Sequence, residues 1–142
     1  MNEDIIRFLR GRKLKKLIKS TYSDVRKIYN VNQIELELLL YLNNHPDAVA
    51  SEINRALGLN KGQVSTALFD LGRKNFIIAR TNRKDRRFTD YLMTEKGQEL
   101  ITEVIRIRTG FYDRLFAGVS ENDKEVLRRV TEQINRNMEH LV

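Results

Sequence analysis

Apolar residues recur at three- and four-residue spacings along most of this chain, and this helical periodicity constrains the fold more than any other feature. One proline and seven glycines are the few residues among 142 that would readily interrupt it. One stretch departs from the pattern: residues 76–81 and 88–93 have the β-branched and aromatic composition of strands, with a polar tip between them. The sequence therefore predicts a mainly α protein with one small β-hairpin.

Capping residues and apolar stripes predict the order of the helices. Asn32 with Glu35 is close to a capping box and begins one helix, and Pro46 lies beyond the end of that helix. Gly58 can end the next helix and Asn60 can begin the one after it, which leaves the link of about three residues that is typical of a helix-turn-helix. The expected helices span residues 4–29, 32–43, 50–57 and 61–74, with two longer helices that begin after Thr94 and Ser120.

The hairpin follows the helix-turn-helix directly, and its tip carries a cluster of basic side chains. This order of elements predicts a winged helix-turn-helix. The formal net charge of +7 makes nucleic acid the leading class of partner. A helix fits the major groove of B-DNA, which is about 12 Å wide, and its outward polar side chains can meet base edges there. We therefore expect the chain to bind double-stranded DNA through the helix at 61–74 and the hairpin tip.

The predicted DNA contacts divide by their chemistry. Gln63 suits bidentate hydrogen bonds to adenine and Thr66 suits contact with a thymine methyl group, whereas Arg73 and Lys74 are expected to hold the DNA backbone. Phe69 is expected to pack under the hairpin, with contact to thymine methyl groups as the alternative. The predicted contacts are Asn60, Lys61, Gln63, Ser65, Thr66, Arg73 and Lys74 on the helix and Arg83, Lys84, Arg86 and Arg87 in the hairpin.

Several classes of function are excluded by what the sequence lacks. There is no cysteine, so disulfides, thiolate metal sites and thiol-based sensing are ruled out. His45 and His140 are the only histidines, and we find no nucleophile with a base, no metal-ligand spacing and no glycine-rich phosphate loop. We therefore expect no enzyme activity and no cofactor. No uncharged run approaches the roughly 20 residues of a membrane span, so a cytoplasmic protein is expected.

Motifs in the middle of the chain resemble the MarR (multiple antibiotic resistance regulator) family. The resemblance covers the recognition helix, the D-x-R motif of the wing and the L-T-x-x-G motif that follows it. Its residues are Leu57 to Lys61, the apolar positions Val64, Leu68 and Leu71, the wing segment Asp85 to Arg87, and Met93 to Gly97. Asn75 stands where the family usually has glycine, but asparagine tolerates the left-handed conformation that this turn requires.

The resemblance implies a regulator that binds one pseudo-palindromic operator as a homodimer. In the family, a wing arginine enters the minor groove and a wing aspartate orients the hairpin; by position these are Arg87 and Asp85. The apolar stripes of the last two helices independently favour a dimer, because a monomer of this size would expose too much apolar surface. We expect a single domain over residues 1–142, in which 33–93 bind DNA and 1–30 with 94–142 dimerise.

The family's usual mode of regulation implies a ligand-responsive repressor. Its ligand would be a small aromatic or amphipathic anion in a cleft between the dimerisation helices and the DNA-binding lobe. Candidates for the lining are Tyr22, Arg26, Tyr29 and Tyr41, although tyrosines packed in the core are the alternative. A second class of function also stays open: a winged helix that docks another protein without sequence-specific DNA binding.

Overall fold

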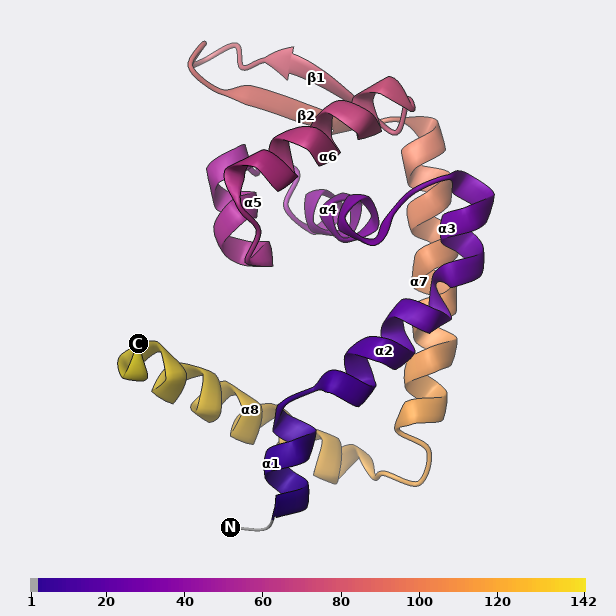
Figure 1. The fold of residues 1–142 in the computed structure, drawn as a ribbon, viewed down its shortest axis with the longest axis vertical. Coiled ribbons are helices and arrows are strands. Elements are labelled where there is room, and N and C mark those ends of the chain that lie inside the picture. Colours follow the sequence, from indigo (N-terminus) through magenta and orange to yellow (C-terminus); the bar gives the residue numbers. More distant parts are fainter. Residues whose placement is uncertain (1–2) are drawn as a thin grey trace. The chain divides into compact units, whose positions relative to one another are not determined.

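The computed structural model describes residues 3–142; Met1 and Asn2, part of the first predicted dimerisation segment, lie outside the described residues. The chain divides into two compact units, one ending at Arg108 and one spanning Thr109–Val142, and each is described by itself. The elements are α1 (Glu3–Leu9), α2 (Arg12–Thr21), α3 (Ser23–Tyr29), α4 (Gln33–Asn44), α5 (Ala50–Leu57), α6 (Lys61–Arg73), β1 (Ile77–Thr81), β2 (Thr89–Met93), α7 (Glu95–Leu115) and α8 (Glu121–Leu141) (Figure 1).

The predicted mainly α fold with one hairpin is confirmed. Strands β1 and β2 pair antiparallel, with Ile77 opposite Met93 and Thr81 opposite Thr89. Alternate residues of β1 face opposite sides, so Ile77 is buried whereas its neighbour Ile78 is 57% exposed. The base of the hairpin at Ile77 therefore packs on the core, whereas the rest of β1 is exposed.

The single long helix predicted over residues 4–29 was wrong, because the chain forms α1, α2 and α3 there. Gly11 has a φ of 67°, a left-handed conformation that glycine adopts without strain and that stops α1 before α2. A second break lies at Tyr22, with φ of −95° and ψ of 2°. Neither α1 nor α2 contributes a buried residue, so tertiary packing within the described chain does not hold this segment straight.

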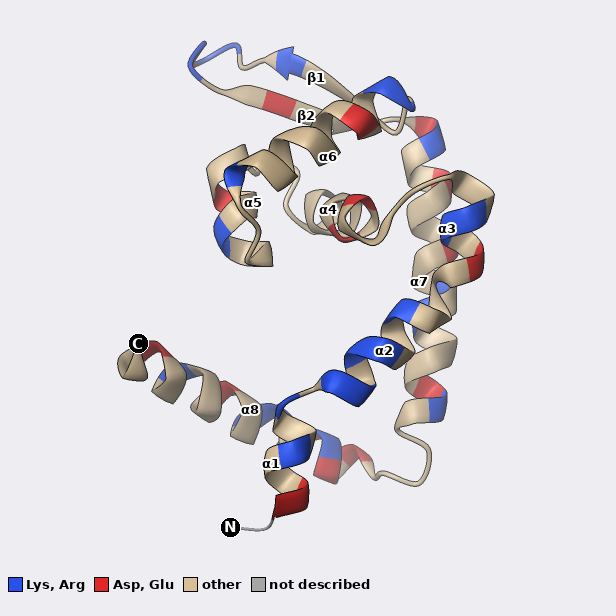
Figure 2. Cartoon of the chain, in the orientation of Figure 1, with Lys and Arg blue, Asp and Glu red and all other residues tan. Residues whose placement is uncertain are grey.

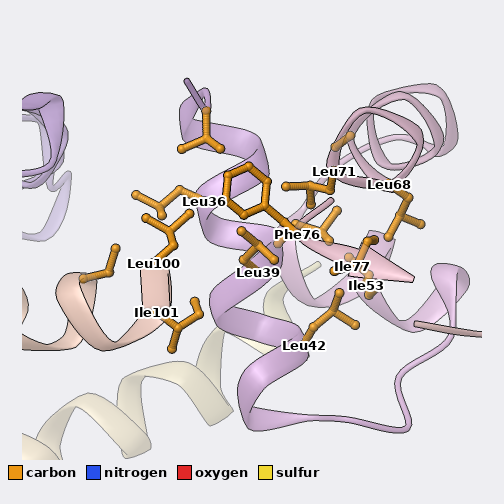
Figure 3. Packing of buried hydrophobic residues seen from close by; sticks show 14 of the residues in the cluster. Leu36, Leu39, Leu42, Ile53, Leu68, Leu71, Phe76, Ile77, Leu100 and Ile101 are labelled. Carbon is orange, nitrogen blue, oxygen red and sulfur yellow. The ribbon is translucent and has the colours of Figure 1, made fainter. Parts of the chain in front are cut away.

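The core of the first unit gathers apolar side chains from helices α4, α5, α6, the start of α7 and the hairpin (Figure 3). Val64, Leu68 and Leu71 form the buried edge of α6 as expected, and Ala67 joins them. Phe76, Leu36, Leu39 and Ile53 are fully buried around this edge, with Leu100 and Ile101 from α7. Because one stripe of α6 is anchored in this way, its opposite stripe is held outward in a defined orientation.

The junction between α6, the hairpin and α7 is closely packed. Asn75 has a φ of 67°, so asparagine takes the left-handed position that the family usually gives to glycine. The Thr94 hydroxyl donates to the Asn75 carbonyl oxygen at 2.6 Å and accepts from the Gly97 amide at 3.1 Å. A Cβ atom on Gly97 would clash with the Phe76 carbonyl oxygen and the Met93 side chain, so only glycine fits here. The glycine of the exit motif therefore allows α7 to start against the base of the hairpin.

Candidate nucleic-acid interface

The candidate interface begins with the helix-turn-helix formed by α5 and α6. Gly58 ends α5 with a φ of 63°, and Asn60 begins α6 as its N-cap. On α6, the stripe opposite the buried edge consists of Gly62, Thr66, Phe69 and Arg73. All predicted DNA contacts of the helix and the wing tip are exposed except Lys74. The outward stripe of α6 is therefore accessible to a large ligand such as a DNA duplex.

Phe69 does not pack under the hairpin as the sequence led us to expect. Its side chain lies on the outward stripe and is 70% exposed. The core beneath the hairpin is already filled by Phe76 and Ile77, which are 0% and 2% exposed. Phe76 and Ile77 thus occupy the space that Phe69 would need in order to pack under the hairpin.

The polar start of α6 is organised by a reciprocal capping box. The Asn60 side chain accepts from the Gln63 amide at 2.8 Å, and the Gln63 side-chain oxygen accepts from the Asn60 amide at 3.1 Å. Each amide oxygen thereby accepts one hydrogen bond within the helix, so Gln63 would have to recognise adenine with its second lone pair or after its capping bond is broken. The structure thus adds a capping role to a residue that the sequence singled out for base reading.

The capping box supports a prediction for Gln63. Gln63→Ala is expected to lower the free energy of unfolding by about 0.5–1 kcal/mol, because one reciprocal capping bond is lost. Gln63→Glu, which keeps the acceptor and adds a negative charge near the helix N-terminus, is expected to retain stability. Chemical denaturation measures both values. A Gln63→Ala protein as stable as the parent would show that the capping bond contributes nothing.

The wing tip is ordered by two side chains. The Asn82 side-chain oxygen accepts from the amides of Lys84 and Asp85, both at 2.9 Å, and its nitrogen donates to Asp90 at 2.9 Å. The Asp85 carboxylate accepts from the Arg87 amide at 3.1 Å and from its guanidinium at 3.0 and 2.7 Å. Sequence reasoning overlooked Asn82, although asparagine is favoured where a side chain must accept from the backbone of a turn.

Electrostatics at the tip favour the charged form of the Asp85–Arg87 pair. The hydrogen bonds from the Arg87 side chain and backbone hold the pKa of Asp85 below its usual value. The Arg87 side chain remains 83% exposed while it is paired. Figure 2 shows basic residues along the hairpin tip, where Arg83, Lys84 and Arg86 are also exposed. The tip therefore presents cations on a backbone that is fixed by its own side chains.

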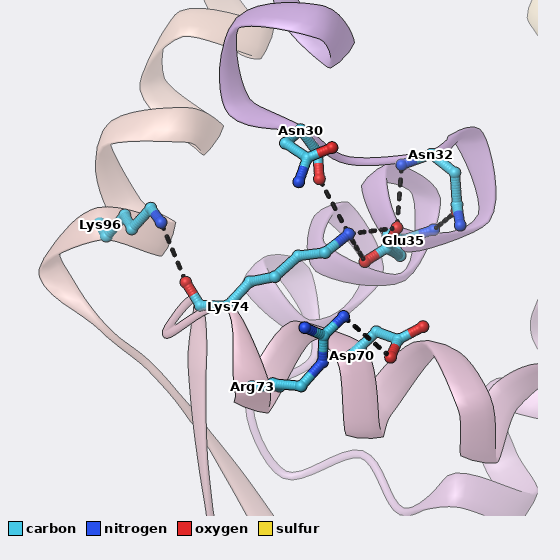
Figure 4. A network of polar contacts seen from close by, with 7 residues as sticks. All are labelled: Asn30, Asn32, Glu35, Asp70, Arg73, Lys74 and Lys96. Carbon is cyan, nitrogen blue, oxygen red and sulfur yellow. Dashed lines mark hydrogen bonds and ion pairs between the residues drawn. The ribbon is translucent and has the colours of Figure 1, made fainter.

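Lys74, which the sequence assigns to the DNA backbone, lies in a half-buried network at the end of α6 (Figure 4). Its ammonium group donates to the two carboxylate oxygens of Glu35 at 3.1 and 2.9 Å and to the Asn30 carbonyl oxygen at 2.8 Å. Glu35 is 1% exposed and also accepts from the Asn32 amide at 2.9 Å. Lys74 thus ties the end of α6 to the start of α4, because a buried carboxylate requires a compensating cation.

The structure revises the set of residues predicted to line a ligand cleft. Tyr22 is a core residue at 5% exposure, and the Arg26 guanidinium donates to the Gln33 side chain at 2.6 Å and to the Lys19 carbonyl oxygen at 2.8 Å. Tyr41 donates to Glu52 at 3.0 Å, and burial together with this hydrogen bond raises the pKa of its hydroxyl. These side chains are committed to packing or to hydrogen bonds within the protein.

Tyr29, the remaining member of the four, lines a cavity against α7. The cavity has a volume of about 410 Å³. Its other lining residues are Thr21, Asp24, Val25, Ile28, Glu103, Arg106 and Ile107. Two carboxylates against one guanidinium do not favour an anion, and Arg106 is already paired with Glu103 at 2.5 Å. The anionic ligand expected from the resemblance therefore does not match this lining.

Residues 3–142 contain neither a metal site nor a membrane-spanning helix. No cluster of three or more histidine or acidic side chains in this range has the arrangement of a metal site. Nor does any helix in the described part of the chain combine the length and apolar character needed to cross a membrane.

The helix-turn-helix, the anchored outward stripe of α6 and the hairpin that follows define a winged helix-turn-helix protein. A MarR family model matches residues 29–87, which contain this arrangement. The transcriptional repressor MprA of Escherichia coli is 27% identical over 84 residues, covering 59% of this chain and 48% of MprA. This chain thus spans about half the length of that relative. YdgJ of Bacillus subtilis, an uncharacterized HTH-type transcriptional regulator, is 23% identical over 111 residues, covering 78% of this chain and 68% of YdgJ.

Solved structures share the fold over nearly the whole chain. A MarR transcriptional regulator from Methanosarcina mazei superimposes with a TM-score of 0.81 at 18% identity, covering 99% of this chain and 100% of that one. FabT of Streptococcus pneumoniae, solved in complex with DNA, gives a TM-score of 0.80 at 20% identity, covering 99% and 100%. Residues 29–87 therefore match the MarR family model, and the chain shares its fold with the MarR regulator of Methanosarcina mazei.

Proposed function

We propose that this protein is a sequence-specific DNA-binding transcriptional regulator that represses by binding a pseudo-palindromic operator as a homodimer. One observation carries the proposal: the anchored α6 holds an exposed stripe outward, and the next element is a hairpin with basic residues at its tip. A helix in the major groove and cations near phosphate are the two components of winged-helix recognition. Repression is the activity named for the relative MprA.

Apolar surface on two separate elements supports the homodimer. In α1, Ile5, Phe8 and Leu9 are 49%, 65% and 51% exposed. Helix α8 buries no residue, and it exposes Leu127 and Val130 at 40% and 49%. A second copy of the chain is the simplest partner for such faces, since symmetric dimers are the commonest soluble oligomers. The division into 33–93 for DNA and 1–30 with 94–142 for dimerisation remains part of this proposal.

Response to a small molecule is the finer part of the proposal. The cavity that Tyr29 lines, between α2 and α3 on one side and α7 on the other, suits an aromatic compound that is neutral or cationic. Isothermal titration calorimetry with neutral, cationic and anionic aromatic compounds of the same ring size would test which ligand charge the cavity prefers. Preferential binding of the anion would contradict the argument from Asp24 and Glu103.

Salt dependence of DNA binding tests the central claim. Binding to random duplex DNA should weaken steeply as salt rises, because each phosphate that is neutralised releases about 0.9 counterion. Selection from a random duplex pool should then enrich an inverted repeat. A chain that retains its fold but binds no duplex at low salt would instead be a protein-docking winged helix.

The wing supports a further prediction. Arg87→Ala is expected to weaken operator binding and to reduce the salt slope by about one charge per subunit, because an exposed guanidinium gains most in the narrow minor groove. Thermal stability and dimerisation should change little. The measurement is an operator titration at several salt concentrations. An unchanged salt slope would mean that Arg87 does not contact DNA.

The Asp85→Ala variant tests whether Asp85 orients Arg87 or only contributes a negative charge. Removing the carboxylate raises the net charge and by electrostatics alone should tighten DNA binding. If Asp85 orients Arg87 through the hydrogen bonds described above, binding should weaken instead. We expect weaker binding at fixed salt, and tighter binding would show that Asp85 has no orienting role.

A further inference from the structure

Phe69 is the large apolar residue on the outward stripe of α6, and it is 70% exposed. Its neighbours along this stripe are Thr66, one turn before it, and Arg73, one turn after it. Figure 2 shows α6 largely without charge: Lys61 lies at its start, and Asp70 and Arg73 lie near its end. The middle of the helix therefore offers an aromatic ring and a threonine methyl group to whatever it meets.

Two polar side chains of α6 near Phe69, those of Gln63 and Arg73, are engaged within the protein. Gln63 is bonded in the capping box through its side-chain oxygen, and it lies to the side of the outward stripe. Arg73 pairs with Asp70 at 3.7 Å, so the nearest cation is partly neutralised by a carboxylate. Gly62 has no side chain, which leaves room for a ligand to approach the ring from the N-terminal side. Beside the hydroxyl groups of Ser65 and Thr66, the main accessible group at the centre of the stripe is therefore the apolar ring of Phe69.

The major groove of DNA offers one prominent apolar group, the C5 methyl of thymine. An aromatic ring that enters the groove gains by covering this methyl and loses contact where cytosine or uracil stands instead. We propose that Phe69 determines specificity by contacting thymine methyl groups in each half-site, with the methyl group of Thr66 beside it. The inference rests on the proposed function, since it assigns a base preference to a DNA-binding helix.

Removal of single methyl groups from the DNA tests this proposal. The best duplex from the random-pool selection is resynthesised with deoxyuridine in place of each thymine in turn, alone and at its symmetry mate. Affinity for the full-length protein is measured at one salt concentration. At one position, removal of a single methyl group should lower the affinity about fourfold, and removal from both half-sites should lower it about fifteenfold.

Variants of the protein identify the side chain that reads the methyl group. Phe69→Ala should bind thymine and deoxyuridine duplexes equally, whereas Phe69→Leu should keep part of the preference because it retains an apolar side chain. Ile78→Ala is the matched control: Ile78 is an exposed apolar residue on the hairpin, so its removal should leave the thymine preference intact. Unchanged thermal unfolding of Phe69→Ala, expected for an exposed position, ensures that folded proteins are compared.

Two results would overturn the inference while leaving the proposed function standing. One is a selected duplex whose affinity is indifferent to every deoxyuridine substitution, or which has no thymine in its half-sites. The other is a Phe69→Ala protein that keeps the full preference of the parent. Absence of any salt-dependent duplex binding would overturn the proposed function itself, and the assignment of Phe69 with it.

Discussion

Lys74→Met is expected to lower the free energy of unfolding by about 3 kcal/mol, because it leaves the Glu35 carboxylate buried without its cation. Glu35 is 1% exposed, and the Lys74 side chain is 19% exposed, so water replaces the ammonium group poorly. Methionine preserves much of the apolar stem of lysine, which limits the loss from packing. The loss in the free energy of unfolding therefore comes chiefly from the uncompensated charge of Glu35. Urea denaturation measures it.

The double variant Glu35→Gln/Lys74→Met provides the control. Glutamine carries no charge and can still accept from the Asn32 amide, as Glu35 does at 2.9 Å. The double variant should therefore recover most of the stability that the single variant loses. Lys96→Met is a second control. Lys96 is exposed, donates to the Lys74 carbonyl oxygen at 3.0 Å and faces the Phe76 ring. We expect this change to lower the free energy of unfolding by about 1 kcal/mol or less. A similar loss for Lys96→Met would contradict a special role for burial.

The same Lys74 variant decides between the structural role and the DNA-backbone contact expected from the sequence. At a temperature where the variant is folded, its salt slope for duplex DNA should match that of the parent, because Lys74 faces Glu35. A slope reduced by about one charge per subunit would restore Lys74 to the DNA interface.

Val130→Glu is expected to have the largest effect on DNA binding, through loss of the homodimer. Val130 is 49% exposed in the single chain, so the folded protomer tolerates a carboxylate there. In an apolar dimer interface the same carboxylate is desolvated without a partner, which costs several kcal/mol per copy and occurs twice by symmetry. We expect a monomer at micromolar concentration and operator affinity reduced by at least about a hundredfold, equivalent to about 2.7 kcal/mol.

Arg129→Gln is the matched control for Val130→Glu. It changes the net charge by the same amount at the preceding residue, but Arg129 is turned about 100° around α8 from Val130 and lies outside the apolar stripe. Light scattering should give a dimer for Arg129→Gln and a monomer for Val130→Glu. If Val130→Glu remains a dimer with unchanged operator affinity, the apolar stripe of α8 is not the interface.

Local patterns in the sequence predicted much of the winged helix-turn-helix correctly. The N-cap residues Asn32 and Asn60 and the left-handed Gly58 gave the helix boundaries to within about one residue, because such signals act over a single turn. The buried stripe of α6 followed from its periodicity. The hairpin followed from its strand composition and its polar tip.

The candidate site was less well predicted wherever a residue's partner lies far along the chain. Lys74 and Phe69 illustrate this: the charged Lys74 pairs with a buried carboxylate, whereas the aromatic Phe69 is exposed to solvent. Lys74 meets Glu35 across 39 positions, a separation that no local pattern encodes. Similarly, Tyr22 and Tyr41 looked alike in the sequence, yet Tyr22 lies in the core and Tyr41 bonds to Glu52.

The sequence by itself determined the winged helix-turn-helix, because helix caps, turn residues and apolar periodicity depend on neighbours within a few positions. Only the tertiary structure decided which side chains remain available to a ligand. The break of the first helix at Gly11 and Tyr22, the ion pair of Lys74 with Glu35 and the exposure of Phe69 depend on which elements compete for the same space. Burial and ion pairing are properties of that space, and residues distant in the chain create it.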